Sequence, residues 1–138
     1  INGVDSENLL HTPLVDKYAS PVSSDPRLRE LVTNLVRKIA GNMNIVTEGR
    51  DTTTVIFPNA DYKFYFDASV EERAKRRVEE QKGVTYEEVL ASIKKRDKND
   101  MEKEVGALKK AKNAIYIDTT NLTIDAVCEK VLLAMQKH

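Results

Sequence analysis

Residues 44–51 of this chain read Asn-Ile-Val-Thr-Glu-Gly-Arg-Asp, and residues 52–58 continue as Thr-Thr-Thr-Val-Ile-Phe-Pro. The short apolar run stops at Gly49 and is followed at once by Arg50 and Asp51. A buried parallel strand ends in this way when it brings charged groups to the ligand-binding edge of a sheet. The stretch therefore predicts a strand at about 44–48 in an α/β protein that handles phosphates.

Strands and helices alternate along the rest of the chain. Further strands are expected at 62–67 and 114–118, and helices at about 26–40, 70–82, 86–98 and 124–135. The expected helices begin at capping residues: Asp25, Ser69, Thr85 with Glu88 as a capping box, and Thr123 or Asn121. Residues 1–24 read as a loop-rich lead-in, and 99–112 as irregular or weakly helical. This alternation indicates the α/β class with a parallel sheet.

The totals limit the classes of function. A chain of 138 residues that is 41% hydrophobic and 32% charged fits a soluble globular protein. No window approaches the ~18 apolar residues of a membrane span. The 22 basic and 22 acidic residues cancel, which disfavours nucleic-acid binding through net charge. The one cysteine, Cys128, is predicted to be a buried structural thiol, and a single thiol fits a reducing cytoplasm.

Three arginines, Arg73, Arg76 and Arg77, recur at i, i+3 and i+4 on one expected helix. This spacing places them on one side, where they form either a clamp for polyphosphate oxygens or a solvated face balanced by neighbouring glutamates. Both interpretations are open. The charged segment that begins at Arg96 and Asp97 likewise either contributes to a ligand-binding site or consists of charged residues exposed to solvent on the surface.

Arg50 and Asp51 also have two interpretations. They form a structural ion pair, or they meet a ligand at the end of the strand. In the second case arginine suits a phosphate and aspartate suits an amino-group donor. Cytosine has such a donor at N4, whereas uracil has an acceptor there, so a carboxylate would select cytosine over uracil.

Along essentially its whole length the chain resembles the bacterial cytidylate (CMP) kinases, which belong to the nucleoside monophosphate kinases. The resemblance rests on these stretches: Thr12-Pro13, Ser20, 26–30, 48–51, 54–58, Ala68-Ser69, 71–74, Arg76-Arg77, Ile93, Arg96-Asp97, Asp100, Ala114 and Ile117-Asp118. It implies transfer of a phosphoryl group from ATP, with Mg²⁺, to CMP or dCMP.

The resemblance also implies roles for individual residues. The catalytic group would be Arg50, on the acceptor phosphate, with Arg76, Arg77 and Arg96. Substrate contacts would come from Ser20, Arg29 and Asp51 at the cytosine and from Asp100, with Arg96, at the sugar and its neighbourhood. Lys103 would be a further substrate-binding residue. Arg73 would lie at the start of a mobile lid whose closure excludes water. No metal-binding residue is expected within this sequence.

The sequence departs from the family pattern in one large respect. Its 138 residues contain no Gly-x-x-x-x-Gly-Lys-Ser/Thr loop, which cradles the ATP phosphates and helps to hold Mg²⁺. Smaller departures are Thr53, where the family usually has glycine, and Lys103, where it usually has arginine; lysine lacks the bidentate fork.

We therefore expect a C-terminal fragment with an incomplete, P-loop-NTPase-like parallel sheet flanked by helices. Residues 1–24 would be the remainder of the nucleotide-monophosphate-binding insert, 25–138 the C-terminal part of the kinase core, and 73–103 the region of the lid. Exposed strand edges recruit partners, so self-association or pairing with another chain is expected. A noncatalytic nucleotide-binding or pseudoenzyme module is the alternative. A nucleic-acid-associated domain is disfavoured by the zero net charge and the 6% aromatic content.

Overall fold

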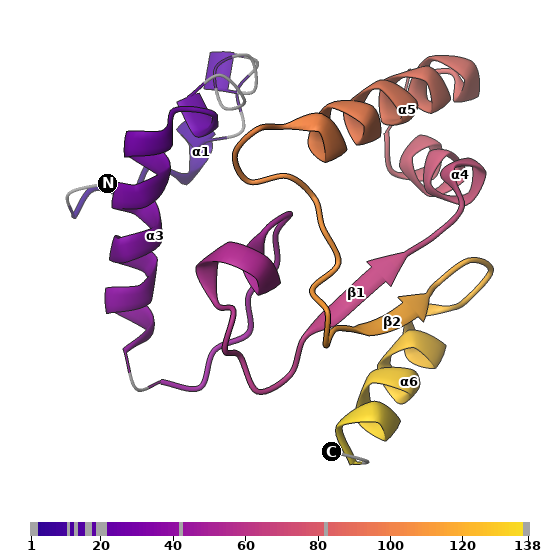
Figure 1. Cartoon of the computed structure of the whole chain (residues 1–138). Helices are drawn as coiled ribbons and strands as arrows, with labels where there is room; N and C mark the ends of the chain where they lie inside the picture. The colour runs from indigo at the N-terminus through magenta and orange to yellow at the C-terminus, as the bar shows by residue number, and fades with distance from the viewer. Residues whose placement is uncertain are drawn as a thin grey trace. The chain divides into compact units, whose positions relative to one another are not determined.

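The computed structural model describes residues 3–10, 12, 14–15, 18, 22–41, 43–81 and 83–136 (Figure 1). The chain divides into two compact units, Ile1–Val46 and Thr47–His138, and each has its own secondary structure.

The first unit contains α1 (Glu7–Leu10) and the long helix α3 (Pro26–Ala40). The Asp25 carboxylate accepts hydrogen bonds from two backbone N–H groups of the first turn of α3, at 2.8 and 3.3 Å. It thereby satisfies donors that a helix leaves unpaired at its start. Gly41 ends the helix with a φ of 46°. Both predicted ends of α3 are confirmed, whereas α1 is a helix inside the lead-in that was predicted to be loop-rich.

The second unit contains a parallel pair of strands, β1 (Phe64–Asp67) and β2 (Ile115–Asp118). Phe64 pairs with Ile115 at one end and Asp67 with Asp118 at the other, and Figure 1 shows the two arrows pointing the same way. The strands predicted at 62–67 and 114–118 are confirmed with slightly shorter bounds. The mixed α/β class and the parallel pairing are confirmed as well.

The strand predicted at 44–48 is wrong. Residues 44–49 form no strand, and the side chain of Val46 is fully exposed. A strand persists only where a neighbouring backbone completes its hydrogen bonds. Among the described residues the sheet consists of β1 and β2 alone, so this apolar run has no strand beside it.

Three helices complete the second unit: α4 (Val70–Glu80), α5 (Tyr86–Glu102) and α6 (Ile124–Gln136). Ser69 caps α4, and Thr85 forms the predicted capping box at the start of α5. Helices α4 and α5 lie side by side as a helical hairpin (Figure 1). The three predicted helices are confirmed, but α5 continues to residue 102 instead of ending near 98.

The core of the second unit is small. Its buried apolar side chains are Ala68, Ala74, Val89, Ala107, Ala111 and Ile117. The prediction that Cys128 is buried is wrong, because this residue is exposed on α6. Helix α6 has no buried residue, and Ile124 at its start is 82% exposed. A helix is about 10 Å wide, and two strands about 4.8 Å apart are too narrow to cover its apolar face.

Candidate functional site

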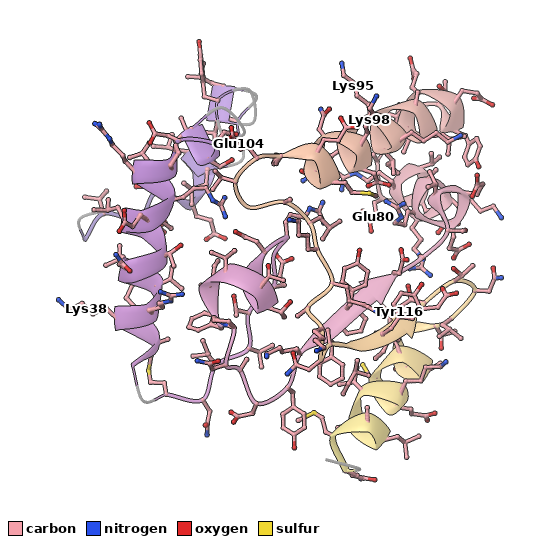
Figure 2. The ribbon with its side chains drawn as sticks, in the orientation of Figure 1. Lys38, Glu80, Lys95, Lys98, Glu104 and Tyr116 are labelled. Carbon is pink, nitrogen blue, oxygen red and sulfur yellow. The ribbon has the colours of Figure 1, made fainter. Side chains whose placement is uncertain are left out.

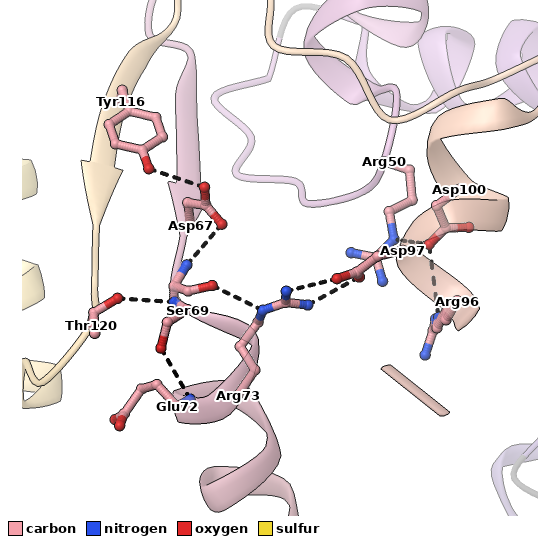
Figure 3. Close-up of polar contacts among 11 residues, drawn as sticks. Arg50, Asp67, Ser69, Glu72, Arg73, Arg96, Asp97, Asp100, Tyr116 and Thr120 are labelled. Atoms are coloured by element: carbon pink, nitrogen blue, oxygen red, sulfur yellow. Dashed lines mark hydrogen bonds and ion pairs between the residues drawn. The ribbon is translucent and has the colours of Figure 1, made fainter. Parts of the chain in front are cut away.

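Asp100 is a buried carboxylate on α5 that gathers cations from two parts of the chain (Figure 3). Its Oδ2 lies 2.9 Å from Arg50 Nε and 3.8 Å from Arg96 Nε. Its Oδ1 lies 3.0 Å from Lys103 Nζ. We call these four residues the Asp100 cluster. The side chain of Asp100 is 8% exposed, whereas those of Arg50 and Arg96 are 49% and 71% exposed. The carboxylate therefore holds two guanidinium groups that remain open to solvent.

Helix geometry explains most of this arrangement. Arg96 and Asp100 are four residues apart on α5, which places them on one face. Lys103 follows directly after the last helical residue. Only Arg50 comes from a distant segment, the loop that precedes β1 in the sequence. The cluster thus joins the end of α5 to the stretch in which the sequence predicted a site.

The pKa of Asp100 reflects two opposing effects. Burial of the carboxylate acts to raise the pKa. The hydrogen bond from Lys103 and the positive charges of Lys103, Arg50 and Arg96 act in the opposite direction and outweigh it, so the pKa lies below its ordinary value. Asp100 is therefore a carboxylate at neutral pH, and its negative charge is outnumbered by three cations.

The loop that supplies Arg50 has an unusual backbone. Asp51 is 6% exposed and precedes η1 (Thr52–Ile56), a turn of π-helix. Such turns are rare and are often found at functional sites. The ion pair that the structure gives Arg50 is with Asp100, so the interpretation of adjacent Arg50 and Asp51 as a structural pair is not supported. A Cβ atom at position 49 would lie 2.5 Å from Thr52 Oγ1, so any residue other than glycine would force the Thr52 side chain or the loop to shift.

Arg73 lies at the base of the α4–α5 hairpin and forms a fork with Asp97 on α5 (Figure 3). Its Nη1 and Nη2 donate to Asp97 Oδ1 and Oδ2 at 3.0 and 2.7 Å. Its Nε donates to the backbone carbonyl of Ala68, just beyond β1, at 3.1 Å. The bond to Asp97 raises the pKa of Arg73. Each of the three guanidinium nitrogens thus has a protein acceptor.

Arg76 and Arg77 diverge from Arg73 despite their spacing. Arg76 Nη2 donates to the carbonyl of Thr119 at 2.6 Å, and its Nε pairs with Glu72 at 3.1 Å. Arg77 pairs with Glu80 at 3.4 Å, and both side chains are more than half exposed. An exposed pair of this kind contributes at most about 1 kcal/mol, so the pair leaves the Arg77 guanidinium readily available.

Two candidate residues belong to the first unit. Arg29 Nη1 donates to the backbone carbonyl of Ser23 at 3.2 Å. Ser20 lies outside the described residues. The structure therefore brings together Arg50, Arg96, Asp100 and Lys103, and gives separate surroundings to Arg73, Arg76 and Arg77.

Sequence reasoning missed the contacts at the carboxyl ends of β1 and β2. Thr119 Oγ1 donates to the carbonyl of Asp67 at 2.9 Å, and Tyr116 Oη donates to the carboxylate of Asp67 at 3.0 Å. Figure 2 shows Tyr116 on β2. Both contacts lie where parallel strands of α/β proteins end in ligand sites. The rule that placed Arg50 at such an edge applies equally to Thr119, which follows the predicted strand at 114–118, but not to Tyr116, which lies within that strand.

The described ranges contain no group of three or more His, Cys, Asp or Glu side chains placed to hold a metal ion. In the same ranges, no helix is both long and apolar enough to cross a membrane.

A parallel α/β unit that presents exposed arginines around one buried carboxylate defines a class of protein suited to anionic ligands. Comparison with known proteins identifies the family: a model for "Cytidylate kinase" matches residues 1–137. The chain belongs to the cytidylate kinase family.

Curated relatives agree with this assignment. A protein described as cytidylate kinase from Thermosipho melanesiensis is 47% identical over 99% of this chain and 65% of its own length. One from Fervidobacterium nodosum is 44% identical over 96% of the chain and 62% of its own length. One from Caldanaerobacter subterraneus is 43% identical over 100% of the chain and 63% of its own length. The chain thus spans less than two thirds of each of these relatives.

Proposed function

We propose that this chain forms the acceptor-nucleotide part of an enzyme that transfers the terminal phosphoryl group of ATP to CMP or dCMP, giving CDP or dCDP. The observation that carries the proposal is the Asp100 cluster. Three cations surround one carboxylate there, so positive charge remains for an anionic group. Arg50 is held by Asp100 through Nε and is half exposed, which suits a guanidinium that binds a phosphate.

The remaining members of the cluster have complementary roles in this proposal. Arg96 is largely exposed beside the buried Asp100 carboxylate and supports both the phosphate and the sugar. Asp100 orients the two arginines and is near the sugar hydroxyl groups. Lys103 adds charge without a bidentate fork, so it neutralises the phosphate without fixing its orientation. Positioning and charge neutralisation supply most of the rate of phosphoryl transfer.

Asp51 is the proposed cytosine selector. Its carboxylate accepts a hydrogen bond from the N4 amino group of cytosine, whereas the O4 of uracil would face it with a second acceptor. An unmatched buried acceptor is costly, which makes this contact selective. In the first unit, Arg29 and Ser20 would complete the cytosine contacts.

The donor side of the reaction is only partly represented in these residues. Arg76 and Arg77, on α4, are proposed to neutralise the phosphates that transfer, and Arg77 is the more available because its ion pair is exposed. The described residues offer no acidic cluster for Mg²⁺, and the sequence has no Gly-x-x-x-x-Gly-Lys-Ser/Thr loop. These residues do not fit a resident Mg²⁺ site. We therefore expect the 138-residue chain to bind CMP but to form no CDP by itself.

Calorimetric titration tests the acceptor site. CMP and cytidine are compared on the unchanged chain and on Arg50→Gln. Because Arg50 is proposed to contact the phosphate, the substitution is expected to weaken CMP by about tenfold, the loss of roughly 1.4 kcal/mol, and to leave cytidine unaffected. Arg37→Gln, at the end of α3, is the matched control that removes a guanidinium elsewhere. Equal CMP affinity in the unchanged chain and Arg50→Gln would contradict the assignment.

Base selection has its own test. Asp51→Asn replaces the acceptor by an amide that also has N–H donors, so the preference for CMP over UMP is expected to fall by about tenfold or more. An unchanged ratio would exclude Asp51 as the selector. The transfer step is measured on the full-length gene product with ATP, Mg²⁺ and CMP. If that product binds CMP and forms no CDP, the noncatalytic alternative is correct.

A further inference from the structure

Arg73 is connected to the protein at every nitrogen. Its two terminal nitrogens form the fork with Asp97, and its Nε reaches the carbonyl of Ala68. Its side chain is 33% exposed and that of Asp97 is 21% exposed, so the pair is more protected than the Arg77–Glu80 pair on the same helix. Two parallel N–H···O bonds fix both distance and orientation, unlike a single exposed contact.

The fork ends on the helix that carries the Asp100 cluster. Asp97 follows Arg96 and precedes Asp100 by one turn of α5. Figure 3 shows Arg73 approaching this turn from the α4 side while Arg50 reaches Asp100 nearby. Because Arg73 Nε is simultaneously bonded to the carbonyl just beyond β1, the side chain ties this turn of α5 to the end of the strand.

We propose that Arg73 is a positioning residue for the acceptor site: through Asp97 it holds the turn of α5 on which Arg96 and Asp100 meet Arg50. The inference rests on the proposed function, since it assigns Arg73 a task in the same site. It differs from a direct contact with ATP, because Asp97 neutralises the guanidinium and occupies the fork that a phosphate would need. Phosphate binding by the lid then falls first to Arg77, whose ion pair with Glu80 is exposed, because Arg76 also donates through each of its three guanidinium nitrogens.

This role makes a specific claim about the chemistry of position 73. A lysine there keeps the charge but has neither the planar fork nor the Nε donor. If Arg73 acts on phosphates through its charge, Arg73→Lys preserves most of the function. If it acts by positioning α5, Arg73→Lys fails as Arg73→Gln does, and Asp97→Asn reproduces the defect.

The first experiment requires no ligand. The 138-residue chain is labelled with ¹⁵N-arginine, and the Nε–H signal of Arg50 reports its contact with Asp100. Arg73→Gln, Arg73→Lys and Asp97→Asn are each expected to shift or broaden this signal while far-UV circular dichroism stays unchanged. The control is Lys95→Gln, which removes an exposed charge from α5 (Figure 2) and should leave the signal in place. An unchanged Arg50 signal in Arg73→Gln would overturn the proposal. If Arg73→Gln does not fold, the Arg50 signal in Arg73→Lys and in Asp97→Asn provides the same test.

The second experiment measures CMP affinity and the response of Arg73 to tripolyphosphate, which serves as the probe for the ATP phosphates. Arg73→Gln and Arg73→Lys should each weaken CMP binding by about fivefold. The double variant Arg73→Gln with Asp97→Asn should bind CMP no more weakly than the single variants, because each of the three variants removes the same interaction between Arg73 and Asp97. The positioning role would be refuted if the affinity losses of the single variants multiplied in the double variant, or if Arg73→Lys bound CMP as well as the unchanged chain. It would also be refuted if the Arg73 Nε–H signal shifted on addition of tripolyphosphate. If the unchanged chain binds no CMP, the proposed function fails and the Arg50 signal alone decides the role of Arg73.

Discussion

Replacing Asp100 by asparagine removes the one negative charge at the centre of the Asp100 cluster while keeping the size of the side chain. Lys103, Arg50 and Arg96 then lose their shared partner and repel one another. We expect the variant to fold with a lower free energy of unfolding at pH 7. We also expect a loss of CMP affinity, since Arg50 and Arg96 are no longer held in place.

The magnitude follows from the geometry and exposure of each contact. The bond from Lys103 is 3.0 Å long and mostly protected, and a hydrogen bond between charged groups of this kind contributes about 1.5–3 kcal/mol. Arg50 and Arg96 are 49% and 71% exposed, so each of their ion pairs contributes at most about 1 kcal/mol. Asparagine retains one acceptor and is cheaper to bury than a carboxylate, which offsets part of the loss. The expected decrease is about 2 kcal/mol.

The decrease should depend on pH in a defined direction. Burial acts to raise the pKa of Asp100, but its three cationic partners hold it below the ordinary value of 3.8 in the folded chain. A group whose pKa is depressed by folding stabilises the folded state at pH values above its unfolded pKa. This contribution is lost as the pH falls through the folded pKa. The difference between the unchanged chain and Asp100→Asn should therefore be full at pH 7 and shrink below pH 3.8.

Urea unfolding followed by circular dichroism measures this difference at a series of pH values. Glu104→Gln is the control, because Glu104 is an exposed carboxylate close in sequence to Lys103 (Figure 2), and it should change stability by less than about 0.5 kcal/mol. The reasoning is refuted if Asp100→Asn is as stable as the unchanged chain at pH 7. A decrease of equal size at neutral and acid pH would also refute it, since packing and not charge would then be responsible.

Three further predictions concern the second unit. Thr85→Ala removes the capping box of α5 and should lower the free energy of unfolding by about 1 kcal/mol in urea titrations. No change would mean that the capping box does not contribute to the stability of the folded chain. Cys128 is exposed and should react with a thiol reagent at the same rate in the folded and urea-unfolded chain, whereas strong protection would restore the buried assignment. The hydrogen bond to Asp67 raises the pKa of Tyr116 above 10.0, so Asp67→Asn should lower the midpoint of the Tyr116 NMR titration, and an unmoved midpoint would exclude that contact.

Local signals were sufficient for the helices α3, α4, α5 and α6 and for two strands, but not for α1 or η1. Asp25, Ser69 and Thr85 cap helices because their side-chain oxygens accept from N–H groups two or three residues ahead, which is a property of a short stretch of chain. The stretch 44–48 shows the limit of such reasoning. Its apolar run has strand character, but a strand also needs a partner, and hydrogen bonding between strands is not encoded in either strand alone.

Within the site, too, some features could be predicted from the sequence and others could not. The order of residues along the chain placed Arg96 and Asp100 on one helix face, put Arg50 directly after a glycine at the end of an apolar run, and carried the resemblance to the cytidylate kinase family. Tertiary packing alone decided that Arg50 pairs with Asp100 instead of its neighbour Asp51. It also decided that the two terminal nitrogens of Arg73 donate to Asp97. These partners lie far apart in sequence, and electrostatic pairing depends on distance and burial in space, which no local pattern specifies.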